Sequence, residues 1–114
     1  MPFLRIQTNQ VLDGPEASAL ASKASTLVAG QLGKPERYVM VSVENNPAMQ
    51  FAGSDAPLAY LELKSIGLPE SATSTLSAAL CQLLASEAAI EPERVYIEFM
   101  DAPRKMWGWN NSTF

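Results

Sequence analysis

Apolar residues alternate along the chain between a helical period and a strand period. The helical period covers residues 15–33, where the apolar positions are Leu20, Ala24, Leu27 and Val28. Pro15 follows an Asp-Gly pair and Gly33 ends the run, as expected for the start and stop of a helix. The two-residue period follows in residues 38–43, and it predicts a half-buried strand with Val39, Val41 and Val43 on one face.

The second half of the chain repeats this order of signals. Pro69-Glu70 predicts a helix start, and the apolar face that follows consists of Leu76, Ala79, Leu80, Leu83 and Leu84. Pro92-Glu93-Arg94 precedes a second alternating segment at residues 95–100, as Pro35-Glu36-Arg37 precedes the first one. Strand-like segments also precede the two helices, at residues 3–7 and 58–63. The sequence therefore predicts two βαβ units in tandem.

Two βαβ units predict a single α+β (α/β two-layer) domain over residues 1–114. Right-handed crossovers would place both helices on one face of a four-stranded mixed sheet, and leave the other face uncovered. The expected outward positions on that face include Tyr38, Met40, Tyr96 and Met100, which are apolar for a solvated surface. We therefore expect an oligomer in which a neighbouring subunit covers this face.

The composition restricts the chemistry open to such a domain. The chain has no histidine, which removes Ser-His-Asp and Cys-His nucleophiles and most zinc and copper sites, so we expect no metal and no cofactor. Eight basic residues are scattered among twelve acidic ones, for a net charge of -4, which argues against a nucleic-acid partner. No secretory signal or membrane-length apolar run is present, and Cys81 is the one cysteine. We expect a cytoplasmic protein without membrane partners.

Pro2 is the first candidate for chemistry. Removal of Met1 would give it a free secondary amine, and an α-amino group titrates near pH 7.7–8.0. Burial or a nearby lysine would lower this pKa towards the working pH of a general base. Proline after an initial methionine is also common without any functional role, so the residue by itself leaves both interpretations open.

Three further features could bind a substrate. Lys34 directly follows the predicted helix, where it could bind a carboxylate or simply lie in solvent. Backbone N–H groups at residues 64–67, where a strand ends, could bind an anion or form an ordinary turn. The C-terminal stretch contains Trp107, Trp109 and Phe114 and is too apolar for a loose tail, so it must pack on a pocket or a neighbouring chain.

These features occur together in one known family. The sequence resembles macrophage migration inhibitory factor and D-dopachrome tautomerase, of the tautomerase superfamily, nearly from end to end. The matching segments are Met1-Pro2, Thr8-Asn9, Gly33-Lys34-Pro35, Phe51-Ala52-Gly53-Ser54, Ser65-Ile66-Gly67, Leu80-Cys81, Pro92 to Ile97 and Gly108 to Phe114. The initial proline and the last heptad are the most specific of these segments.

The resemblance implies a cofactor-independent keto–enol tautomerase, a homotrimer with an active site at each subunit interface. It implies that Pro2 is the catalytic base and that Lys34 and the backbone N–H of Ile66 bind a substrate carboxylate. Tyr96 from a neighbouring subunit would line the pocket. The apolar wall would consist of Met40, Trp107, Trp109 and Phe114, which suits an aromatic α-keto acid such as phenylpyruvate.

The sequence departs from the migration-inhibitory-factor pattern at three places. Glu98 stands where the family pattern has asparagine, and its charge would weaken carboxylate binding and raise the pKa of Pro2, unless Lys34 or Arg37 neutralises it. Trp107 replaces a small aliphatic residue at the pocket rim, so substrate preference is expected to differ. Leu58 and Leu61 occupy the positions of a cysteine pair credited with thiol redox activity, which excludes a disulfide oxidoreductase.

Two alternatives to a tautomerase remain open at this stage. One is a cytokine-like signalling or binding protein with a vestigial tautomerase site. The other uses the same Pro2 for dehalogenation or decarboxylation, as distant relatives do, although the additional arginine or acidic groups of those relatives are not identifiable here.

Overall fold

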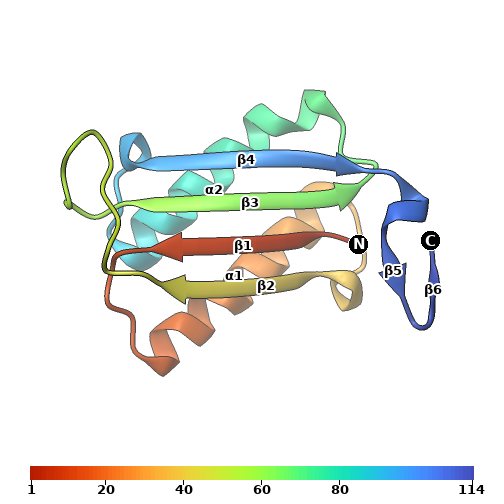
Figure 1. Cartoon of the computed structure of the whole chain (residues 1–114), viewed down its shortest axis with the longest axis horizontal. Helices are drawn as coiled ribbons and strands as arrows, with labels where there is room; N and C mark the ends of the chain where they lie inside the picture. Colours follow the sequence, from red (N-terminus) through yellow and green to blue (C-terminus); the bar gives the residue numbers. More distant parts are fainter.

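The computed structural model, which describes residues 1–114, contains a four-stranded sheet with two helices on one face (Figure 1). The strands are β1 (Phe3–Thr8), β2 (Met40–Asn45), β3 (Ala59–Ile66) and β4 (Val95–Ala102), and the helices are α1 (Gly14–Leu32) and α2 (Thr73–Ala88). The sheet order is β2-β1-β3-β4. β1 is parallel to β2 and β3 to β4, while the central pair β1 and β3 is antiparallel. The predicted α+β fold of two βαβ units is confirmed.

The two helices begin differently although their sequence signals look alike. Asp13 caps α1 by accepting a hydrogen bond from the Glu16 backbone, and the Glu16 side chain returns one to Asp13, which forms a capping box. Pro69-Glu70 instead leads into a single 3₁₀ turn at Glu70–Ala72, and α2 begins only at Thr73. No side chain caps α2, since Ala72 stands at its N-cap position. The predicted start was therefore three residues too early.

The hydrophobic core fills the layer between the sheet and the helices. Leu4 and Ile6 from β1 and Leu61 and Leu63 from β3 are fully buried there. The helices contribute the buried residues Leu20, Ala24, Val28, Leu76, Leu80 and Leu84. Each such leucine stabilises the fold by about 1.5–3 kcal/mol relative to an exposed one. Neither helix is long and apolar enough to cross a membrane.

The face of the sheet opposite the helices carries exposed apolar side chains towards its ends and a charged row in the middle. Ser42, Arg5, Glu62 and Glu98 form its central row across the four strands. Arg5 contacts Glu62 at 3.3 Å and Glu44 at 3.1 Å. The predicted outward positions Met40 and Tyr96 are each 66% exposed towards the ends of the strands, and Met100 is 46% exposed, whereas the charged row between them was not predicted.

Tyr38 does not belong to this face. It ends a 3₁₀ turn, Glu36–Tyr38, and β2 begins two residues later at Met40. The valine alternation that predicted a strand from residue 38 continues through both segments, so it does not mark the true start. The turn places Tyr38 beyond the edge of the sheet, where it contributes to the site described below.

The C-terminal stretch forms a small hairpin beyond the end of β4. Strands β5 (Gly108–Trp109) and β6 (Ser112–Thr113) are antiparallel and are joined by Asn110 and Asn111. Both asparagines have positive φ angles, 50° and 66°, which a tight two-residue hairpin turn requires and which asparagine tolerates. The hairpin lies beside the N-terminus of the chain (Figure 1).

Candidate active site

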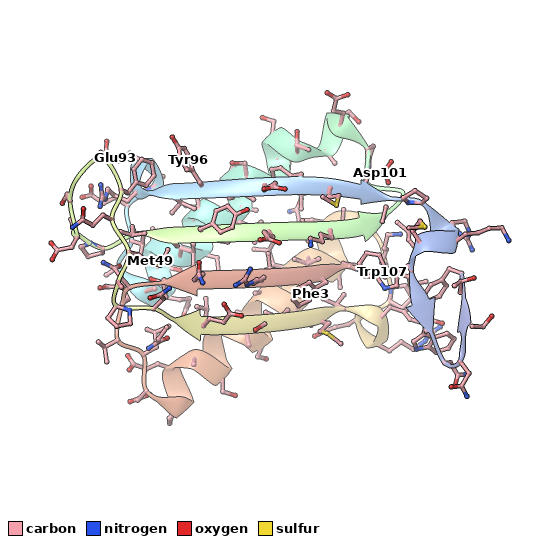
Figure 2. The ribbon with its side chains drawn as sticks, viewed as in Figure 1. Phe3, Met49, Glu93, Tyr96, Asp101 and Trp107 are labelled. Carbon is pink, nitrogen blue, oxygen red and sulfur yellow. The ribbon has the colours of Figure 1, made fainter.

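A hollow of about 480 Å³ lies where β1 begins, between the first residues of β2 and the C-terminal hairpin. Its lining contains five residues predicted from the sequence: Pro2, Met40, Trp107, Trp109 and Phe114. Trp107 lies beside the start of β1 in Figure 2. The lining is mostly apolar, as expected for a pocket that excludes water from a reacting group.

Pro2 is fixed at the inner end of this hollow. Its side chain is less than 2% exposed, and its carbonyl oxygen accepts a hydrogen bond of 3.0 Å from the Met40 backbone N–H. Met1 also lines the hollow, and burial lowers the pKa of its α-amino group below the ordinary 8.0, with the positive charge of Lys34 acting in the same direction. The Met1 amine is therefore held towards its neutral, basic form.

Lys34 and Ile66, the two predicted carboxylate-binding residues, lie next to each other. The Nζ atom of half-buried Lys34 donates a hydrogen bond of 2.9 Å to the Ile66 carbonyl oxygen. Gly33 makes this possible because its left-handed conformation, with φ of 61°, ends α1 and turns the chain back towards the sheet. Neither residue lines the hollow itself, but the Lys34 charge acts on the terminal amine.

Three aromatic rings form one wall of the hollow. Trp109 and Phe114 stack with ring centroids 5.5 Å apart, and Tyr38 meets both rings edge-on at 5.8 and 6.3 Å. The Arg37 guanidinium lies 4.8 Å from the centroid of the Tyr38 ring. The three rings therefore pack against one another, and a cation contacts the Tyr38 ring.

Arg37 and Tyr38 were not predicted to line the pocket. They line the hollow because the 3₁₀ turn lifts them out of the strand, which no alternation pattern signals. Phe3 and Lys64 also line it and were not predicted as site residues. Phe3 had a usable signal, since it alternates with core residues Leu4 and Ile6 and must face away from the helices.

The structure of one protomer does not bring Tyr96 and Glu98 to the hollow. Tyr96 on β4 lies opposite Tyr60 on β3, and Tyr60 lies opposite Gln7 on β1. Gln7 is five residues from Pro2, which corresponds to roughly 16 Å at the usual strand rise. The Tyr96 ring contacts Phe51 instead, with centroids 4.5 Å apart. Glu98 accepts a hydrogen bond of 2.8 Å from the Tyr60 hydroxyl, and this contact, with some burial, raises the pKa of Tyr60 to about 12.

No residues are placed to hold a metal. The chain contains no group of three or more His, Cys, Asp or Glu side chains arranged as possible ligands. Leu58 and Leu61 are both buried core residues.

Comparison with known proteins identifies the family. The family model of macrophage migration inhibitory factor (MIF) matches residues 1–114. A macrophage migration inhibitory factor homolog of Brugia malayi is 42% identical over 100% of this chain and 99% of that protein. The mouse macrophage migration inhibitory factor is 36% identical over the same shares.

A crystal structure of the homologue from Prochlorococcus marinus has a TM-score of 0.91 and 40% identity, and the match covers 98% of each chain. The chain belongs to the macrophage migration inhibitory factor family of the tautomerase superfamily.

Proposed function

We propose that this protein is a cofactor-independent keto–enol tautomerase that acts on phenylpyruvate-type aromatic α-keto acids as a homotrimer. One observation carries the proposal: Pro2 is buried in an apolar hollow, and the same surroundings lower the pKa of the neighbouring Met1 amine. Membership of a family known for phenylpyruvate tautomerase activity supports it.

The reaction needs one base and no other reagent. The neutral Pro2 nitrogen takes a proton from the carbon beside the substrate carbonyl, and the C–H electron pair becomes the C=C bond while the carbonyl oxygen gains a proton from water. The protonated Pro2 then gives its proton to water, so that one proton in total has moved from carbon to oxygen. In the reverse direction Pro2, protonated by water, gives its proton to carbon while the enol O–H proton passes to water, which leaves Pro2 neutral again. The apolar lining favours the neutral amine, and a fixed base of this kind accelerates proton transfer by about 10²- to 10⁴-fold.

The substrate is held at both of its ends. Lys34 and the backbone N–H of Ile66 bind the carboxylate, while Trp109 and Phe114 contact the aromatic ring. Tyr96 and Glu98 lie too far along the sheet to reach the hollow of their own chain, so their proposed role requires that they enter the site of a neighbouring subunit. The exposed face formed by β1 to β4 supports an assembly in which subunits cover one another.

The direct test is a tautomerase assay on protein whose N-terminus is Pro2. Wild type is expected to accelerate the conversion of enol-phenylpyruvate to the keto form, as followed by ultraviolet absorbance. Light scattering is expected to give the mass of three chains. Absence of acceleration in a sample that lacks Met1 and is trimeric would refute the proposed function.

Lys34→Met is expected to raise KM for phenylpyruvate by about 10- to 100-fold, because a charge-assisted hydrogen bond to a carboxylate contributes about 1.5–3 kcal/mol. The effect on kcat should be smaller, since Pro2 remains in place. Steady-state kinetics check this, with Lys105→Met as the matched control because Lys105 is exposed and forms no ion pair. Equal KM values for wild type and Lys34→Met would contradict the assignment.

Glu98→Asn is expected to lower KM by about threefold, because one negative charge near the substrate carboxylate is removed. The pKa of Pro2 should fall slightly, since Glu98 favours its protonated form. The pKa of Tyr60 should also fall towards 10.0, because its hydroxyl loses a charged acceptor. Kinetics and a spectrophotometric tyrosine titration measure these effects, with exposed Glu93→Gln as the control. An unchanged KM together with an unchanged pH profile would discard the role of Glu98.

A further inference from the structure

Arg94 fixes the loop that connects β2 to β3. Its guanidinium donates four hydrogen bonds to backbone carbonyl oxygens of this loop. The acceptors and distances are Phe51 at 2.8 Å, Ala56 at 2.9 Å, Ser54 at 3.1 Å and Pro57 at 3.3 Å. None of the four ion pairs in the protein involves Arg94, so its charge is satisfied by this loop alone.

The most tightly held residue of the loop is Phe51. Its backbone exchanges two hydrogen bonds with Ser54, of 2.9 and 3.0 Å, across a turn in which Ala52 and Gly53 have positive φ angles of 54° and 71°. Arg94 binds the Phe51 carbonyl oxygen, and its Cζ atom lies 5.2 Å from the centroid of the Phe51 ring. Both the backbone and the ring of Phe51 are therefore positioned by Arg94.

The Phe51 ring in turn supports Tyr96. The two ring centroids are 4.5 Å apart with planes tilted by 38°, and this is the one aromatic contact that Tyr96 makes. Tyr96 is 66% exposed and its hydroxyl forms no hydrogen bond within the protomer. Met49 and Tyr96 lie at the end of the sheet opposite Trp107 (Figure 2). Phe51 is therefore the aromatic ring that restricts the rotamer of the exposed Tyr96 side chain.

We propose that Arg94 is a positioning residue for the tautomerase reaction. Arg94 fixes the loop backbone through its carbonyl groups, and this backbone positions the Phe51 ring. The Phe51 ring then orients Tyr96 for the active site of the neighbouring subunit. The inference rests on the proposed function and on the contribution of Tyr96 across the subunit interface. Lysine is a poor substitute, because its ammonium has three donors rather than the planar set of five that reaches all four carbonyls.

The test compares Arg94→Met, Phe51→Leu and the double variant in the trimeric protein with Pro2 at its N-terminus. Arg94→Met and Phe51→Leu are each expected to raise KM for phenylpyruvate by about tenfold, with kcat and the pH profile nearly unchanged, because Pro2 and Lys34 are untouched. The double variant should match the single ones to within about twofold, since both changes act through the same ring. Arg94→Lys should give an intermediate KM, and exposed Arg104→Met serves as the control.

Several results would overturn the proposal. An unchanged KM in trimeric Arg94→Met or Arg94→Lys would do so, as would additive effects in the double variant. A fall in kcat as large as the rise in KM, together with a shifted pH profile, would indicate a general structural role instead. Nuclear Overhauser contacts between the Phe51 and Tyr96 rings provide a readout independent of catalysis: they should weaken in Arg94→Met, and their full retention refutes the positioning role even if wild type proves to be inactive.

Discussion

Pro2→Gly is expected to lower kcat/KM for phenylpyruvate by about 100-fold or more, with most of the loss in kcat. Glycine also supplies a terminal amine, but without the pyrrolidine ring this amine rotates freely and is better hydrated. Its pKa therefore rises towards the ordinary value, and it no longer stays within reach of the substrate carbon. Steady-state kinetics on protein without Met1 measure the effect.

Pro69→Gly is the matched control for this substitution. Pro69 is exposed and precedes the 3₁₀ turn before α2, so its loss affects the unfolded chain and not the hollow. Thermal unfolding and light scattering should show that the Pro2→Gly protein is folded and trimeric. Wild-type activity in that folded protein would refute catalysis by Pro2, whereas a signalling or binding role would be expected to survive the substitution.

The doubled βαβ fold could be predicted because its signals are local. Helical and strand periods alternate in the same order in both halves, and Asp13 and Gly33 mark the ends of α1 directly. The start of α2 and the 3₁₀ turn at Tyr38 were missed because a proline and a periodic apolar pattern are compatible with either helix type and with a strand. The hairpin at residues 108–113 was missed because each of its strands has only two residues.

The candidate site followed from the family resemblance more than from any local pattern. Pro2 by itself left two interpretations open, and only the apolar C-terminal stretch indicated from its residues that it must pack on a pocket or a neighbouring chain. Arg94 gave no such signal. Pro-Glu-Arg indicates only a turn before a strand in both halves, yet Arg94 donates hydrogen bonds to carbonyl oxygens of the β2–β3 loop that are 37 to 43 residues away in the sequence. Contacts at that separation follow from the packing of the loop and not from any local pattern, so no spacing rule could have found them.

Removal of Met1 is expected to switch the activity on. While Met1 is attached, the Pro2 nitrogen is an amide without a basic lone pair, and the nearest amine is one residue away from the buried position. Protein that retains Met1 and the same protein treated with a methionine aminopeptidase should differ in kcat by the full factor contributed by the base, about 10²- to 10⁴-fold. Activity should increase in proportion to the processed fraction seen by mass spectrometry, and full activity in an unprocessed sample would contradict the mechanism.

The pH profile of the protein without Met1 shows whether the pKa of the Pro2 amine is lowered. Burial, and then the charge of Lys34, lowers the pKa of the Met1 amine below 8.0, and Pro2 lies deeper in the same hollow. Because only the neutral amine accepts a proton, kcat/KM should rise with pH and level off above a midpoint below 8.0. In Lys34→Met the midpoint should move upwards, since a neighbouring positive charge is lost. An NMR titration of the Pro2 nitrogen measures the same pKa directly; a value at or above 8.0 would mean that the hollow does not activate the base.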